Sequence, residues 1–202
     1  MDAIRSDPLD ALMSGHLSWV AQTDCGEIHL PTIGPSAVLS GSFNPLHRGH
    51  WQLAAVAERK LGRPVAFEIS IANVDKPDIA LGDLMARLDQ FHGLDAVAIT
   101  RAATFEAKAR LFPECIFVVG ADTAIRILQP RCYGNDPERM HDALNTIRAN
   151  GCRFLVGGRL DPDGPFVELD AIGIPDEFRD LFMGLSETEF RVDISSTELR
   201  IR

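Results

Sequence analysis

Short apolar runs alternate with amphipathic stretches from about residue 36 onward. The apolar runs predict strands at residues 37–41, 65–71, 96–100, 115–119 and 153–156. The amphipathic stretches between and after them predict helices at residues 50–61, 83–94, 104–111, 121–128 and 137–149. This alternation predicts a single-domain α/β protein with a doubly wound parallel sheet and right-handed crossovers.

The run CIFVV at residues 115–119 is nearly all apolar, which predicts a central strand covered on both faces. Ligands of such sheets bind beyond the carboxyl ends of the strands, where the strand order reverses, so we expect the chemistry in the loops that follow the strands. Residues 1–35 predict a short helix, begun by Asp7 and Pro8, and then a loop. We therefore divide the chain into an N-terminal extension, residues 1–35, and a domain, residues 36–202; after residue 164 the pattern is less regular.

The composition narrows the class of protein. The chain has 202 residues, 46% of them apolar, and a formal net charge of −9. That length suffices for one domain with a core, and the acidic balance argues against nucleic-acid binding, which relies on Lys and Arg. No apolar run reaches the roughly 20 residues of a membrane helix. The four cysteines are widely spaced and the start of the chain lacks a secretory signal, so we expect free thiols and a cytoplasmic protein without membrane contact.

The loop after the first strand of the domain carries the clearest chemistry. It reads GSFNPLHRGH at residues 41–50, a glycine-containing turn from strand to helix that lets phosphate approach backbone N–H groups. It matches neither the dinucleotide fingerprint nor the P-loop. His47 and His50, with Gly49 between them, suit phosphoryl-type transfer, in which positioned donors stabilise spreading charge. The alternatives are surface histidines or half of a metal site, but no Cys or Asp partner lies nearby in the sequence.

A second polar segment, ISSTELR, lies near the end of the chain at residues 194–200. Ser195, Ser196 and Thr197 place three hydroxyls at a predicted helix start, where they can donate to phosphate oxygens. Arg200 lies one turn further and presents a permanently charged guanidinium to the same anion. The alternative is an ordinary helix cap followed by a surface arginine.

Together these segments resemble a known family. GSFNPLHRGH resembles the H-x-G-H signature, and ISSTELR the I-S-S-T-x-[LI]-R motif, of the nucleotidyltransferase superfamily, and the loop is most similar to the nicotinamide/nicotinate mononucleotide adenylyltransferases. The resemblance covers residues 36–202 and implies a Rossmann-like nucleotidyltransferase fold. It further implies a nucleoside triphosphate substrate, ATP in preference to CTP, with Mg²⁺ bound to it, and a phosphorylated small-molecule acceptor from pyridine nucleotide biosynthesis.

The resemblance also assigns roles to residues. It implies that His47, His50 and Arg200 are catalytic and that Lys76 and Arg87 contact the acceptor. It implies nucleotide contacts from Gly41, Ser42, Phe43, Asn44, Gly49, Gly120, Asp122, Arg159, Ser195, Ser196 and Thr197. Alternative interpretations remain for several of them, because Lys76 and Arg87 could be solvated charges and Asp122 a helix cap. We expect Trp51 to belong to the core rather than to stack on a base.

Other functions stay open at this point. One is a cytidylyltransferase or an adenylyltransferase for pantetheine phosphate, and another is a nucleotide-binding sensor without activity. The chain stops at Arg202, which leaves at most two helical turns after the second motif, and so short a helix is marginal without packing. This feature favours the sensor, or a homo-oligomer in which a partner subunit completes the site.

Overall fold

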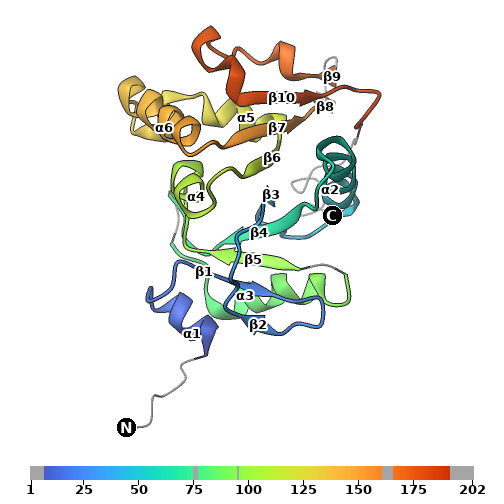
Figure 1. Ribbon diagram of the computed structural model, residues 1–202, viewed down its shortest axis with the longest axis vertical. Helices are drawn as coiled ribbons and strands as arrows, with labels where there is room; N and C mark the ends of the chain where they lie inside the picture. The colour runs from blue at the N-terminus through green and yellow to red at the C-terminus, as the bar shows by residue number, and fades with distance from the viewer. Residues whose placement is uncertain (1–6, 75–76, 95, 161–165, 192–202) are drawn as a thin grey trace.

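A computed structural model describes residues 7–74, 77–94, 96–160 and 166–191, with only the backbone described for Arg159 and Leu160. Its centre is an eight-stranded sheet in the order β10-β7-β6-β3-β4-β5-β1-β2, which Figure 1 shows from β10 at the top to β2 at the bottom. The strands of this sheet are β1 (Trp19–Gln22), β2 (Ile28–His29), β3 (Ala37–Ser40), β4 (Ala66–Ser70), β5 (Val97–Thr100), β6 (Ile116–Gly120), β7 (Arg153–Gly157) and β10 (Phe182–Leu185). A separate two-stranded ladder joins β8 (Arg159–Leu160) and β9 (Phe166–Val167).

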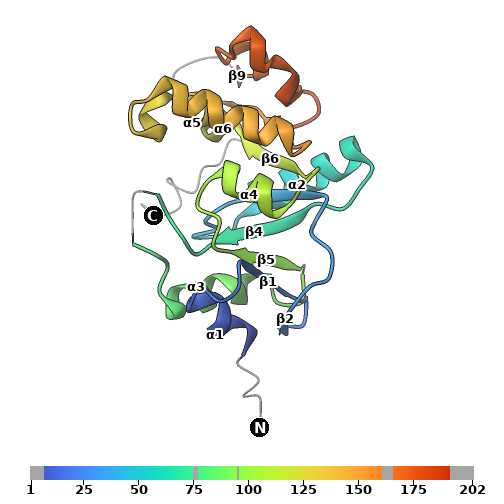
Figure 2. The same ribbon diagram turned by 60° about the vertical axis from the view of Figure 1, so that its left-hand side comes forward.

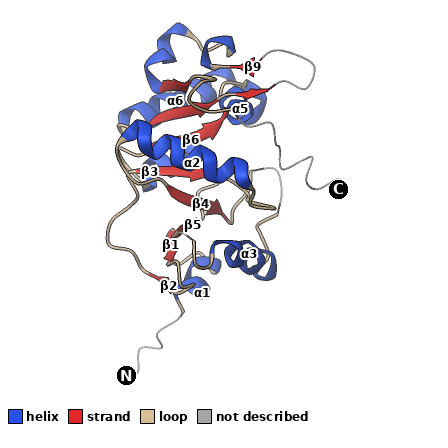
Figure 3. Cartoon of the chain, turned by 90° about the vertical axis from the view of Figure 1, so that its right-hand side faces the viewer, coloured by secondary structure: helices blue, strands red, loops and turns tan. Residues whose placement is uncertain are grey.

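Helices cover both faces of the sheet. The helices are α1 (Pro8–Met13), α2 (Arg48–Leu61), α3 (Leu81–Leu88), α4 (Phe105–Leu111), α5 (Ala121–Ile127) and α6 (Pro137–Ala149), with short 3-10 turns η1 (Asp89–Phe91), η2 (Pro130–Tyr133), η3 (Leu169–Ala171) and η4 (Asp176–Leu181). One buried cluster joins α1, α2 and α3 to one face of the sheet, and a second joins α4, α5 and α6 to the other. Figure 3 shows α2 lying across its face. The six strands β3 to β7 and β10 pair in parallel, so the predicted doubly wound α/β fold is confirmed.

The predicted strand at residues 115–119 is central, as its composition indicated. In the structure it is β6, with Phe117, Val118 and Val119 at most 1% exposed, between β7 and β3. After β3 the chain builds β4 and β5 on one side, and it then returns to place β6 on the other side of β3. The strand order therefore reverses between β3 and β6, which is where ligands bind in open α/β sheets.

Two regions differ from the sequence-based expectation. Residues 1–35 were expected to hold a helix and a loop, but β1 and β2 lie there, and β1 pairs antiparallel with β5. Val20 and Gln22 are buried by this pairing. β1 lies between β5 and β2, and a strand of only four residues has too short a pattern to stand out in a sequence. Near the other end of the described chain, β10 pairs parallel with β7 where no strand was expected. The domain boundary at residue 35 stays a prediction.

The helices of the described chain include none with the length and apolar composition that crossing a membrane requires.

Candidate active site

The first turn of α2 is built from the two histidines. His47 is the N-cap residue, with an extended backbone (φ −146°, ψ 168°), and its Nδ1 accepts the Gly49 N–H at 3.1 Å. His50, at the third helical position, returns the interaction, because its Nδ1 accepts the His47 N–H at 3.2 Å. This is a capping box in which imidazoles replace the usual hydroxyl and carboxylate. The helix start thus fixes both rings, which stack with centroids 3.7 Å apart.

These hydrogen bonds determine the tautomers. A neutral imidazole has one N–H and one bare nitrogen, so a ring whose Nδ1 accepts a hydrogen bond carries its proton on Nε2. Burial lowers the pKa of His47, and burial together with the neighbouring His47 ring lowers the pKa of His50 to about 4. Both rings are therefore neutral near pH 7, and each carries its proton on Nε2.

Phe43 supports the loop from below. Its side chain is 1% exposed and meets the His50 ring edge-on, with centroids 4.9 Å apart, and it packs in the same way on Phe67 and Phe91, each at 5.4 Å. A Cβ at Gly41 would lie 2.7 Å from the Phe43 ring, so the first residue of the loop must be glycine for this ring to fit. Because its side chain is packed beneath the loop, Phe43 can contact a nucleotide only through its backbone, and that contact stays a prediction.

Gln90 binds the loop through two hydrogen bonds, and it is not among the site residues predicted from the sequence. Its Oε1 accepts the Leu46 N–H at 2.8 Å, and its Nε2 donates to the Phe43 carbonyl at 2.9 Å. Arg87, one turn earlier, donates from Nη1 to the Ser42 carbonyl at 3.2 Å. Because these partners are more than 40 residues apart in the chain, no local sequence pattern signals the contact.

Arg87 was expected to contact the acceptor. In the structure its guanidinium is hydrogen-bonded to the loop, and the residue also lines a hollow of about 260 Å³ together with Asn44, Pro45 and Gln90.

The other predicted residues of the loop differ in exposure. Ser42 and Asn44 are exposed, whereas Gly49 is buried in the first turn of α2. Trp51 packs on Phe67, with ring centroids 4.7 Å apart, as a core residue.

Two glycines at neighbouring strand ends shape the same edge of the sheet. Gly120 ends β6 and is the N-cap of α5, and a Cβ there would meet nothing within 4 Å, so the space beside it is open. Asp122 is exposed in the first turn of α5. At Gly157, the last residue of β7, a Cβ would lie 2.7 Å from Leu53 of α2. Gly157 is thus what lets α2 pack closely on the strand.

The side chains of the remaining predicted site residues are not described. Arg159 begins β8, and Gly158 separates it from the last residue of β7, Gly157. Lys76, Ser195, Ser196, Thr197 and Arg200 lie outside the described residues. The structure therefore brings His47, His50, Gly41 and Gly120 to the β3–β6 reversal and leaves the second motif as a prediction.

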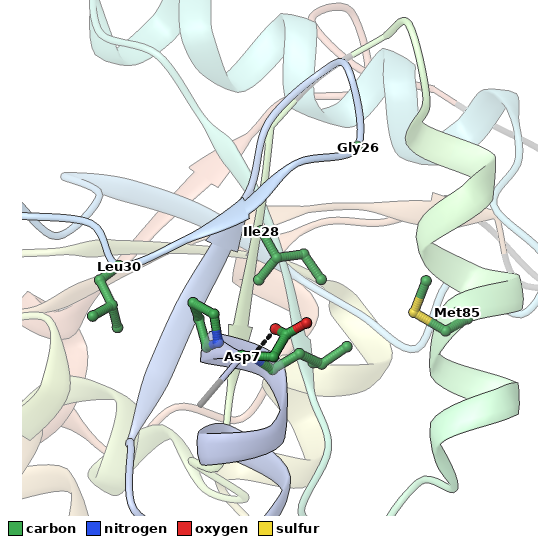
Figure 4. Close-up of a pocket in the computed structure, with 7 residues that line it drawn as sticks. Asp7, Gly26, Ile28, Leu30 and Met85 are labelled. Carbon is green, nitrogen blue, oxygen red and sulfur yellow. Dashed lines mark hydrogen bonds between the residues drawn. The ribbon is translucent and has the colours of Figure 1, made fainter. Parts of the chain in front are cut away.

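A separate hollow of about 690 Å³ lies between α1, β2 and α3 (Figure 4). Its walls include the apolar side chains of Leu9, Ile28, Leu30 and Met85. Asp7 also lines the hollow, and its carboxylate caps α1 by accepting the Leu9 N–H at 2.9 Å. None of the histidine-site residues lines it. We therefore place the candidate active site at the carboxyl ends of the strands and not in this hollow.

A comparison with known families gives a match over residues 38–202 to the family model described as cytidylyltransferase-like. The chain belongs to the cytidylyltransferase-like family. The match begins inside β3 and includes the whole histidine loop, so the site at the β3–β6 reversal lies within the family region. A search of the curated proteins found no match. Membership of this family supports a nucleotidyltransferase that uses a nucleoside triphosphate, and it is equally consistent with cytidylyl and adenylyl transfer.

Proposed function

We propose that this cytidylyltransferase-like protein transfers a nucleoside monophosphate to the phosphate group of a small molecule. An acceptor phosphate oxygen attacks the α-phosphorus of the triphosphate, the bond from that phosphorus to the bridging oxygen breaks, and pyrophosphate leaves with the electron pair. The observation that carries this proposal is the pair of stacked, neutral histidines whose Nδ1 atoms cap α2 at the β3–β6 reversal. Their fixed Nε2–H donors suit a reaction in which charge spreads over non-bridging phosphate oxygens.

The roles divide by position. His47 and His50 donate to the oxygens where charge develops, and a neutral imidazole serves for this because its N–H is already oriented. The loop backbone from Gly41 to Asn44, Gly49, Gly120 and Asp122 surrounds the nucleotide. In this proposal Ser195, Ser196, Thr197, Arg200 and Arg159 hold the leaving pyrophosphate, and Lys76 lies on the acceptor side.

Arg87 takes a changed role in the proposal. Because one of its N–H groups donates to the Ser42 carbonyl, its first role is to stabilise the conformation of the loop. Its remaining N–H groups can still reach an acceptor phosphate, since guanidinium carries five donors.

Mg²⁺ fits the proposal as part of the triphosphate substrate. Among the described residues, no group of three His, Cys, Asp or Glu side chains is arranged to hold a metal ion. Magnesium commonly keeps several waters and binds through substrate phosphates, so a protein cage is not required. The ion would neutralise phosphate charge, while the histidines supply the directed donors.

For the substrates, we favour ATP with nicotinate or nicotinamide mononucleotide, on the resemblance of the 41–50 loop. A cytidylyltransferase and a pantetheine-phosphate adenylyltransferase are the alternatives within the same chemistry. The test is a pyrophosphate-release screen with Mg²⁺ that crosses ATP and CTP with these acceptors. Release that disappears in His47→Asn and His50→Gln supports the proposal, and release that both variants retain contradicts it.

The same screen separates an enzyme from a sensor. A sensor would gain thermal stability with ATP or CTP, because a ligand that binds only the native state stabilises it, but it would release no pyrophosphate with any acceptor.

A further inference from the structure

The eight-stranded sheet ends at β2, and Figure 2 shows this strand at the end of the molecule that also holds α1 and α3. β1 and β2 pair antiparallel, and the Thr23 N–H donates to the Glu27 carbonyl at 2.8 Å. In an antiparallel ladder, hydrogen-bonded pairs alternate with pairs whose backbone groups point away from each other. Ile28, the next residue of β2, therefore directs its N–H and C=O away from β1. Among the described residues, no further strand pairs with this outer edge.

Apolar side chains lie beside this edge on one face of the sheet. Ile28 and Leu30 line the hollow of about 690 Å³ between α1, β2 and α3, and Figure 4 shows Met85 of α3 across the hollow from Ile28. Leu30 is 58% exposed and Met85 39% exposed. Exposed apolar residues are ordinary when they are scattered, but here they adjoin an edge strand, which is a template for pairing with another chain.

The edge is complementary to a second copy of itself. When two β2 strands pair antiparallel with Ile28 opposite Ile28, the two residues exchange backbone hydrogen bonds, and Glu27 of each copy lies opposite His29 of the other. A carboxylate accepts the hydrogen bond that an imidazole N–H donates, so both of these cross-strand pairs are favourable. In the same register Leu30 lies opposite Gly26, which has no side chain and lines the hollow of the other copy. Such self-complementarity is what a two-fold contact between identical chains requires.

We propose that two copies of the protein dimerise through the outer edge of β2, with Ile28 opposite Ile28 on a two-fold axis perpendicular to the sheets. Such an axis keeps the α1 and α3 face of both copies on the same side, so the two hollows adjoin and the Leu30 side chains pack between them. β2 lies outside residues 38–202, which match the family model, so the dimer is a feature of the N-terminal extension and does not depend on the proposed function.

The first test is the mass of the full-length protein, measured by sedimentation equilibrium at concentrations up to about 200 μM, which covers the micromolar affinity of modest interfaces. We expect twice the 22.2 kDa of a single chain. Leu30→Glu should sediment as a single chain, because it places a carboxylate in the apolar contact, and the exposure of this side chain lets the single copy fold. Val74→Glu is the matched control: it replaces a residue that is 59% exposed and follows β4, and it should leave the dimer intact.

The second test addresses the register. Glu27→Lys places a cation opposite His29, and His29→Glu places a carboxylate opposite Glu27, so each variant should weaken the dimer about 3- to 30-fold. The double variant restores opposite charges across the strands and should recover the dimer. Hydrogen exchange followed by NMR adds a local readout. The Ile28 amide should be protected in the dimer and exchange rapidly in Leu30→Glu, whereas the His29 amide, which faces β1, should stay protected in both.

Three results would overturn the proposal. The first is a single-chain mass for the unsubstituted protein at the highest concentration. The second is a dimer that Leu30→Glu retains, which would place the contact elsewhere on the molecule. The third is a dimer in which the Ile28 amide exchanges as rapidly as in Leu30→Glu, or in which the double charge variant is no tighter than the single ones, since the β2 edges would then not be paired in this register.

Discussion

The imidazoles of His47 and His50 stack 3.7 Å apart while each accepts a backbone N–H of the helix that carries them both. Two functions are thereby joined in the same side chains. The Nδ1 atoms satisfy N–H groups that a helix start leaves unpaired, and this fixes the proton of each ring on Nε2. A substitution can therefore separate the structural role of a ring from its donor role.

Replacement of His47 by Asn is expected to preserve the fold and abolish most turnover. Asn is among the best N-cap residues, and its side-chain oxygen takes the place of Nδ1, but it supplies no donor where Nε2–H lies. We expect kcat to fall about 10²- to 10³-fold, the usual loss for one oriented donor. His50→Gln is the matched variant, since Gln at the third helical position completes a capping box.

The control is His47→Ala, which removes both roles. It should lose turnover and also about 1 kcal/mol of the free energy of unfolding, measured by urea titration. If Asn and Ala at residue 47 destabilise the protein equally, the capping role is wrong. If Asn retains full turnover, the donor role is wrong.

Stability should depend on pH through His50. Its pKa is lowered from 6.5 to about 4 in the folded chain, so between these values the unfolded state binds more protons than the folded state. The contribution of His50 to the free energy of unfolding should therefore be constant above pH 6.5 and should fall as the pH drops toward 4. Urea titrations from pH 4 to 8 measure this, with His50→Gln as the comparison. The decline should be shallower in the variant, and identical profiles would contradict the assignment.

Gln90 should act on turnover through the loop. Gln90→Glu keeps an acceptor for the Leu46 N–H but replaces the donor to the Phe43 carbonyl by a second oxygen. A small displacement of catalytic groups can reduce the rate strongly, so we expect kcat to fall at least about tenfold. KM for the triphosphate should change less, since the residue has no place in the proposed binding surface. A loss of stability at unchanged kcat would show that Gln90 is only structural.

A buried ion pair between Glu68 and Lys108 should contribute to stability only as a pair. Lys108 Nζ lies 2.5 Å from Glu68, whose side chain is 0% exposed, and Thr100 Oγ1 donates to the same carboxylate at 2.7 Å. Lys108→Met leaves Glu68 without its cation and should cost about 3–5 kcal/mol in urea titrations. The double variant with Glu68→Gln should recover much of that loss. A double variant no more stable than Lys108→Met would contradict this account.

The local elements were predictable because each is encoded within a few residues. The strands that became β3, β4, β5, β6 and β7 are buried and apolar, and their runs predicted them within one or two residues. The histidine loop was predictable too, because its glycines and imidazoles lie within ten residues and the helix begins among them, at Arg48. Chemistry that lies within one turn of backbone is visible in a sequence.

What the tertiary structure decided involves residues far apart in the chain. The pairing of β1 with β5, the clamp of Gln90 on the loop, the Glu68–Lys108 pair and the fit of Leu53 against Gly157 each join separate segments. By itself, then, the sequence determined the alternating elements, the fold class and the position of the histidines. Which distant side chains meet depended on strand order and helix packing, because those contacts arise only when the separate segments pack in register.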